Sequence, residues 1–77
     1  MNTEFKQMKE GDKARIVGYK QGSGAYRQKL LSMGLTKDTE ITLVKYAPMG
    51  DPVEIELRGF KLSLRKSEAD ILVLEEV

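Results

Sequence analysis

The chain has 77 residues, of which 13 are Lys or Arg and 12 are Asp or Glu, so its formal net charge is +1. Its length predicts a single domain over residues 1–77, and the absence of cysteine and histidine excludes a disulfide framework and a zinc site of the usual ligand types. The near-neutral charge argues against binding to nucleic acid or to an anionic membrane, and the lack of a targeting or membrane-spanning pattern predicts a cytoplasmic protein.

The first predicted strand covers residues 13–19, KARIVGY. A helical period follows over residues 22–35, where apolar side chains expected to face the core recur at i, i+4 and i+7: Tyr26, Leu30 and Met33. Ser23 is the expected N-cap of this helix. Gly34 suits the left-handed position that stops a helix, and Leu35 beyond it is expected to pack back on the last turn.

A second strand is predicted over residues 39–47, TEITLVKYA, and its apolar residues change phase halfway along. One pair lies on each face of the strand: Ile41 with Leu43, then Val44 with Tyr46. This shift predicts a β-bulge or a bend from one side of a barrel to the other. Turn-forming residues follow at 48–52, PMGDP.

Residues 53–64 are predicted to form a β-hairpin around Arg58-Gly59. With a two-residue loop, every cross-strand pair matches in character, and one face is wholly apolar: Val53, Ile55, Leu57, Phe60, Leu62 and Leu64. A slip of one residue would turn one arm inside out, so this agreement favours the register. A longer loop with a bulge is the alternative, because Arg suits a type I′ turn less well than Asn or Asp.

The chain ends with a predicted helical turn that starts at Ser67, followed by a short strand, ILVL at 71–74, which is expected to pair with the first strand. The predicted order is strand, helix and four further strands. Short, closely spaced strands with a single helix between the first and second predict an all-β fold, a small antiparallel barrel. A closed barrel would also protect the strand edges that an open sheet exposes.

Three carboxylates lie close together in the sequence: Asp51, Glu54 and Glu56. Oxygen-rich groups of this kind bind hard cations, or Fe²⁺ weakly. However, the alternation of the hairpin already accounts for the two glutamates as a solvated face, and Glu56 has a cross-strand partner in Lys61. We therefore predict no metal site.

Other site types are also disfavoured. The GSG stretch at 22–24 lacks the further residues of a phosphate-binding loop, so no cofactor is expected. The densest basic residues have acids among them and lack exposed interleaved aromatics, which argues against nucleic acid: Arg27, Lys29, Arg58, Lys61, Arg65 and Lys66. No serine has a visible base to activate it, so we expect a protein-binding module that is not an enzyme.

Two stretches resemble a known family: RQKLLSMGL at 27–35 and APMGDPVEIELRGFKLSLRKSEADILV at 47–73. Their ordered combination is similar to that of the ferrous iron transport protein A family, FeoA, and with the MKEGDKARIVGY start the match covers nearly the whole chain. One departure is TKDTE at 36–40, where the family often has a Pro-Gly turn. The resemblance implies an SH3-like barrel that acts as a cytoplasmic accessory to the membrane transporter FeoB.

The resemblance implies that the chain binds and modulates FeoB, with its cytoplasmic, GTP-binding part as the expected contact, and reaches the membrane only through it. The expected docking residues lie in the loop after the second strand, on the helix and after the hairpin: Pro48, Met49, Gly50, Asp51, Arg27, Lys29, Arg65 and Lys66. The alternative is a free-standing barrel that acts with a nucleic acid or a metal-dependent transcriptional repressor. Weak self-association through strand edges is also open.

Overall fold

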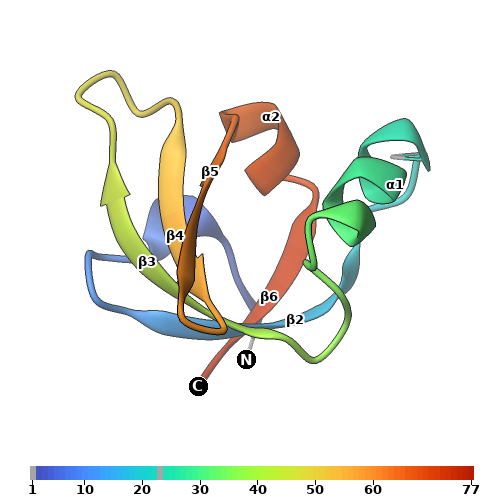
Figure 1. Ribbon diagram of the computed structural model, residues 1–77, viewed down its shortest axis with the longest axis horizontal. Coiled ribbons are helices and arrows are strands. Elements are labelled where there is room, and N and C mark those ends of the chain that lie inside the picture. Colours follow the sequence, from blue (N-terminus) through green and yellow to red (C-terminus); the bar gives the residue numbers. More distant parts are fainter. Residues whose placement is uncertain (1, 23) are drawn as a thin grey trace.

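The computed structural model describes residues 2–22 and 24–77. Six strands form one antiparallel sheet, and helices interrupt it at three places (Figure 1). In chain order the elements are β1 (Asn2–Thr3), the 3-10 helix η1 (Phe5–Gln7), β2 (Lys13–Tyr19), α1 (Gly24–Ser32), β3 (Glu40–Tyr46), β4 (Val53–Leu57), β5 (Phe60–Leu64), α2 (Lys66–Ala69) and β6 (Leu72–Glu76).

The order of strands in the sheet is β1-β6-β2-β3-β4-β5. The predicted small barrel with one helix after its first long strand is confirmed, and the last strand pairs with that first strand, as expected. The two-residue strand β1, which pairs with β6, was not predicted. Strands β1 and β5 stand at the two ends of the order, and in the described part of the chain no pairing joins them. In the described residues, the strands therefore form a barrel-like sheet whose two edges, β1 and β5, are not joined by hydrogen bonds.

The predicted hairpin register is confirmed at every pair from Val53↔Leu64 to Leu57↔Phe60. Its loop has the two-residue form, with a φ of 49° at Arg58 and 84° at Gly59. Positive φ at both loop residues is the type I′ geometry, whose twist matches that of the two strands. The side-chain pattern thus overrode the unfavourable residue at the first loop position.

Strand β3 contains the predicted irregularity. Its pairing with β4 shifts between Leu43 and Lys45, so that Val44 is the extra residue. A bulge of this kind increases the local twist and bends the strand. It explains how Leu43 is fully buried while the residues after it turn partly outward.

The predicted end of α1 is also confirmed. Gly34 has a φ of 90°, its N–H donates to the carbonyl of Leu31, and the N–H of Leu35 donates to the carbonyl of Leu30 at 3.0 Å. These two bonds are the Schellman pattern, which satisfies carbonyls that the last helical turn leaves free. The predicted N-cap at Ser23 lies outside the described residues.

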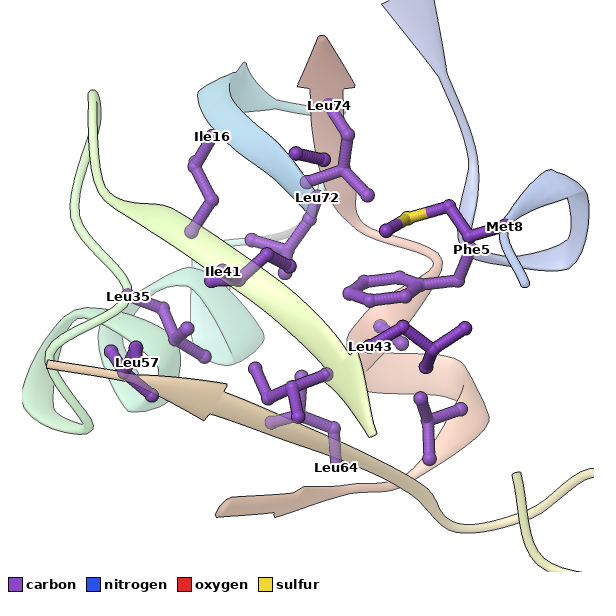
Figure 2. Packing of buried hydrophobic residues seen from close by; sticks show 14 of the residues in the cluster. Phe5, Met8, Ile16, Leu35, Ile41, Leu43, Leu57, Leu64, Leu72 and Leu74 are labelled. Carbon is purple, nitrogen blue, oxygen red and sulfur yellow. The ribbon is translucent and has the colours of Figure 1, made fainter. Parts of the chain in front are cut away.

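The core is a single apolar cluster inside the curved sheet (Figure 2). Each long strand and both α-helices contribute to it, and the segment before β2 adds Phe5 and Met8, which were not predicted. The fully buried large side chains are Ile16, Leu30, Leu35, Ile41, Leu43, Val53, Ile55, Leu57, Leu64, Leu72 and Leu74.

Two residues predicted to be in the core lie on the surface: Phe60 is 48% exposed and Tyr26 is 45% exposed. Strand β5 is an edge strand, and burial along its inward face falls from Leu64 to Phe60 as the strand approaches the turn. Tyr26 belongs to the first turn of α1, whereas the helix packs on the core through its second half, where Leu30 is buried. Met33, by contrast, packs against the core as a partly buried side chain.

Candidate docking site

The β3–β4 loop, α2 and α1 lie at one end of the molecule, and both chain termini lie at the opposite end (Figure 1). We call this the loop end and define it as residues 47–52, residues 65–70 and α1. All eight residues predicted to contact a partner belong to it. The structure therefore brings together segments that are well separated in the sequence.

The loop itself is an ordered turn that presents one apolar side chain. The N–H of Gly50 donates to the carbonyl of Ala47 at 2.7 Å, and the N–H of Ala47 donates to the carbonyl of Pro52 at 3.0 Å. Gly50 has a φ of 83°, a conformation that favours glycine. Met49 at the tip is 91% exposed. A thioether in this position is adaptable contact surface.

Asp51 connects the loop to α2. Its Oδ1 accepts a hydrogen bond from the backbone N–H of Lys66 at 3.0 Å. This N–H belongs to the first helical residue and has no partner inside the helix. The helix therefore begins one residue earlier than the predicted start at Ser67, with Arg65 as its N-cap.

Glu68 connects α2 to α1. Its carboxylate accepts from Lys29 Nζ at 2.6 Å and from the backbone N–H of Arg65 at 3.0 Å, and the residue is only 3% exposed. The hydrogen bond from Lys29 is the main cause that holds the pKa of Glu68 below its usual value, followed by the bond from Arg65. Burial alone would raise this pKa, and the positive charges of Lys29 and Arg65 act against it.

The predicted residue Arg27 has a different environment. Its guanidinium lies 5.2 Å from the centre of the Tyr19 ring, at the end of β2. The Tyr19 hydroxyl in turn donates to the carbonyl of Leu35, just beyond α1. Arg27 thus lies on the side of α1 nearest the end of β2, where its guanidinium packs on the Tyr19 ring. It contributes to the loop end as a separate cation.

Three of the predicted residues line one shallow hollow of 390 Å³. We call it the basic hollow, and its lining is Lys29, Asp51, Pro52, Ser63, Arg65 and Glu68. Sequence reasoning missed Glu68, although the Arg-x-x-Glu spacing across the start of α2 was a usable signal for a capping interaction. Of the other predicted residues, Gly50 and Lys66 line a neighbouring hollow, and Pro48 lines a third next to Tyr46 and Glu54.

That neighbouring hollow has a volume of 240 Å³, and we call it the apolar hollow. It lies between the segment before β2, the start of β4 and α2, and is lined by Phe5, Tyr46, Gly50, Val53, Lys66, Ala69 and Asp70. The sequence offered no sign of it, because Phe5 precedes the first predicted element. Val53 was predicted to face the core, as it does.

The three carboxylates considered for metal binding each have another place in the fold. Glu54 and Glu56 are half-buried on β4, opposite Ser63 and Lys61, and Asp51 bonds to α2. Over residues 2–22 and 24–77, no group of three or more Asp, Glu, His or Cys side chains is placed to hold a metal ion. In the same residues, no helix is long and apolar enough to cross a membrane.

Known proteins share both the sequence and the fold of this chain. A fusion protein of Porphyromonas gingivalis, "Fe(2+) transport protein A/Fe(2+) transporter FeoB", is 37% identical over 65 residues. The match covers 84% of this chain and only 8% of the fusion protein. The solution structure of an FeoA-like protein from Clostridium acetobutylicum is 37% identical, has a TM-score of 0.87, and is matched over 99% of this chain and 87% of that one.

More distant structures share the fold alone. The zinc complex of Stenotrophomonas maltophilia FeoA, described as an SH3 domain protein, is 21% identical with a TM-score of 0.77, over 95% of this chain and 89% of that one. A manganese-dependent transcriptional repressor contains the same barrel at 10% identity and a TM-score of 0.89, over 99% of this chain and 37% of the repressor. The predicted SH3-like barrel is thus confirmed.

The resemblance found in the two sequence stretches extends to the whole fold. Residues 4–76 match the FeoA domain. This chain therefore belongs to the FeoA domain family.

Proposed function

We propose that this chain is an accessory protein of ferrous iron uptake that binds and modulates an FeoB-type transporter. The observation that carries the proposal is the fusion relative, which joins an FeoA part, 37% identical to this chain, to an Fe(2+) transporter. A covalent link raises the effective concentration of two domains into the millimolar range when the linker is short and flexible. Separate chains must achieve the same association through a binding surface.

The loop end is the surface we assign to this binding. It carries the most exposed large apolar side chain in the described residues, Met49, on a loop held by two backbone hydrogen bonds. An ordered loop loses little conformational freedom on binding, which favours affinity. The termini lie at the far end of the molecule (Figure 1), so a domain attached to either terminus would leave the loop end accessible.

We infer a regulatory role, without catalysis and without transport of iron by this chain. The two acids that line the basic hollow already accept hydrogen bonds, Asp51 from Lys66 and Glu68 from Lys29 and Arg65. Their engagement leaves the loop end suited to protein contacts. The transporter's cytoplasmic, GTP-binding part is the expected contact, which places this chain in the cytoplasm and at the membrane only through its partner.

An NMR titration of the labelled chain with that part of FeoB tests the proposal, with GDP and then with a GTP analogue. We expect shifts at Met49, Asp51 and Arg65, and a nucleotide-dependent difference if the role is regulatory. An unchanged spectrum at submillimolar partner would overturn direct binding to this domain. A DNA duplex serves as the comparison, because tight binding to it with a steep salt dependence would favour the repressor-type alternative.

A further inference from the structure

We propose that the partner segment that docks at the loop end supplies one carboxylate to the basic hollow and one apolar side chain to the apolar hollow. This inference rests on the proposed function and adds the chemistry of the recognised segment. Two observations support it. The acids that line the basic hollow already accept hydrogen bonds inside the protein, whereas Arg65 forms no ion pair among the described residues. The second observation is the lining of the two hollows, which both include residues at the start of α2.

The hydrogen-bond donors of the basic hollow favour an acceptor group, although its two cations and two anions sum to a formal charge of zero. Its two acids already accept hydrogen bonds inside the protein: Asp51 from the backbone N–H of Lys66, and Glu68 from Lys29 and from the backbone N–H of Arg65. Arg65 is exposed, and among the described residues no ion pair joins its guanidinium to a carboxylate, although its positive charge also helps to lower the pKa of Glu68. The Lys29 side chain keeps 59% of its surface exposed beyond its bond to Glu68. An incoming carboxylate would therefore find donors on Lys29 and Arg65, beside two acids whose oxygens already have donors, and an Arg can hold it through two parallel hydrogen bonds.

The apolar hollow fits a single side chain. Its volume of 240 Å³ is below the range of about 300–1,000 Å³ that is usual for small-molecule sites. Phe5, Val53 and Ala69 form its buried apolar wall. Tyr46 adds its ring to this wall. The Tyr46 hydroxyl donates to the carbonyls of Phe5 and Met8, so it needs no partner from an inserted side chain. An aliphatic or aromatic side chain inserted here would contact this apolar wall while the Tyr46 hydroxyl keeps its partners inside the protein.

The two hollows are close enough for one short segment. Arg65 lines the basic hollow and Lys66, the next residue, lines the apolar one, with the Asp51 hydrogen bond to Lys66 at the start of the helix. A segment that crosses the start of α2 would reach both. A lipid headgroup surface fits less well, because Asp70 also lines the apolar hollow and would face a dense layer of anions.

Charge reversal at matched positions tests the carboxylate half of the proposal with the full chain and the cytoplasmic part of FeoB. Arg65→Glu and Lys37→Glu change the net charge equally, and Lys37 is exposed in the turn after α1, away from the loop end. We expect Arg65→Glu to raise Kd by about tenfold or more, and Lys37→Glu to change it by less than about twofold. Arg65→Gln, which keeps the backbone cap of α2 and adds no acid beside Glu68, should weaken binding less, in the same direction.

Filtered NOE measurements test the apolar half without any substitution. We expect cross-peaks from aliphatic or aromatic protons of the unlabelled partner to the methyl groups of Val53 and Ala69. Equal Kd values for the Arg65 and Lys37 variants, or a complex without these cross-peaks, would overturn the inference while the proposed function stands. Failure of the wild-type chain to bind would overturn the proposed function itself. Arg65-dependent binding to vesicles of anionic lipid in place of the protein would also overturn the inference.

Discussion

Glu68 shows how one buried carboxylate can organise an entire end of a small domain. It joins α1 to α2 through Lys29 and holds the start of α2 through the N–H of Arg65. We predict that Glu68→Gln lowers the free energy of unfolding by about 1–2 kcal/mol at neutral pH, because a charge-assisted bond in a buried position is lost. Urea denaturation measures the change. The matched control is Glu75→Gln, which removes an exposed ion pair with Arg15 and should cost less than about 1 kcal/mol.

The same carboxylate predicts a pH dependence. Because the pKa of Glu68 is lower in the folded chain than its usual value, the unfolded chain binds the proton more readily. The stabilisation is thus fully present above the usual carboxyl pKa and is lost as the pH falls through the lowered one. Urea titrations at neutral and acidic pH should show the gap between wild type and Glu68→Gln closing under acidic conditions. A gap that stays constant or widens would show that Glu68 is not stabilised as its anion.

Whether a site residue could be predicted depends on how far its interaction partners lie from it in the sequence. Asp51 and Met49 lie within a turn whose composition is visible locally, so the sequence indicated the loop and its exposed tip. Glu68 was missed as a site residue because its role depends on Lys29, which is 39 positions earlier in the chain and reaches it only after folding. The sequence did identify Lys29 and Arg65 as expected docking residues, but not their hydrogen bonds to Glu68.

Glycines lie at both ends of α1, Gly24 as its first residue and Gly34 just beyond its last turn, and we expect them to respond differently to substitution. Gly34 has a φ of 90°, whereas Gly24 does not have a positive φ. We predict that Gly34→Ala lowers the free energy of unfolding by about 1–2 kcal/mol, and that Gly24→Ala leaves it unchanged or raises it by less than about 1 kcal/mol. A built Cβ on Gly34 meets Leu57 only at 3.8 Å, so the cost is conformational and not steric. Thermal unfolding of both variants checks this, and equal melting temperatures would contradict it.

The hairpin offers a substitution that should stabilise the protein. Arg58 adopts a φ of 49° at the first position of a type I′ turn, where Asn is preferred. We predict that Arg58→Asn raises the free energy of unfolding by up to about 1 kcal/mol, while Arg58→Val lowers it, because β-branched residues tolerate positive φ poorly. Urea denaturation of the pair measures both changes. A loss of stability in the Asn variant would show that the 3.5 Å contact of Arg58 with Thr39 matters more than the turn.

Elements were predictable where their pattern is local, and burial was predictable except near the ends of elements. The hairpin register, the bulge in β3 and the stop at Gly34 are all determined by neighbouring residues, and all were predicted. Phe60 and Tyr26 were placed in the core by the same periodicity, yet they are exposed because no other element covers the end of β5 or the first turn of α1. The strand β1 has only two residues, too few for any pattern to reveal it.

The two ends of the molecule differ in the residues that they expose. The loop end gathers the exposed thioether, the two hollows and all eight predicted docking residues, and the opposite end holds both termini (Figure 1). With a net charge of +1, the chain has no strong overall field to orient a partner. Under the proposed function, local complementarity at the loop end determines how the chain docks, so substitutions at the two ends should have unequal effects on binding.

Met49 and Val77 allow this difference to be measured. Both are exposed apolar residues, 91% and 72% respectively, and they lie at opposite ends of the chain's fold. We predict that Met49→Asp weakens binding to the cytoplasmic part of FeoB by about tenfold or more, because it places a charge at the centre of the contact. Val77→Asp alters the net charge identically and should leave Kd within about twofold, since surface substitutions away from a contact have small effects. Calorimetric titration of both variants measures the two constants. Equal weakening by both would indicate a general charge effect, and weakening by Val77→Asp alone would move the docking surface to the end that holds the termini.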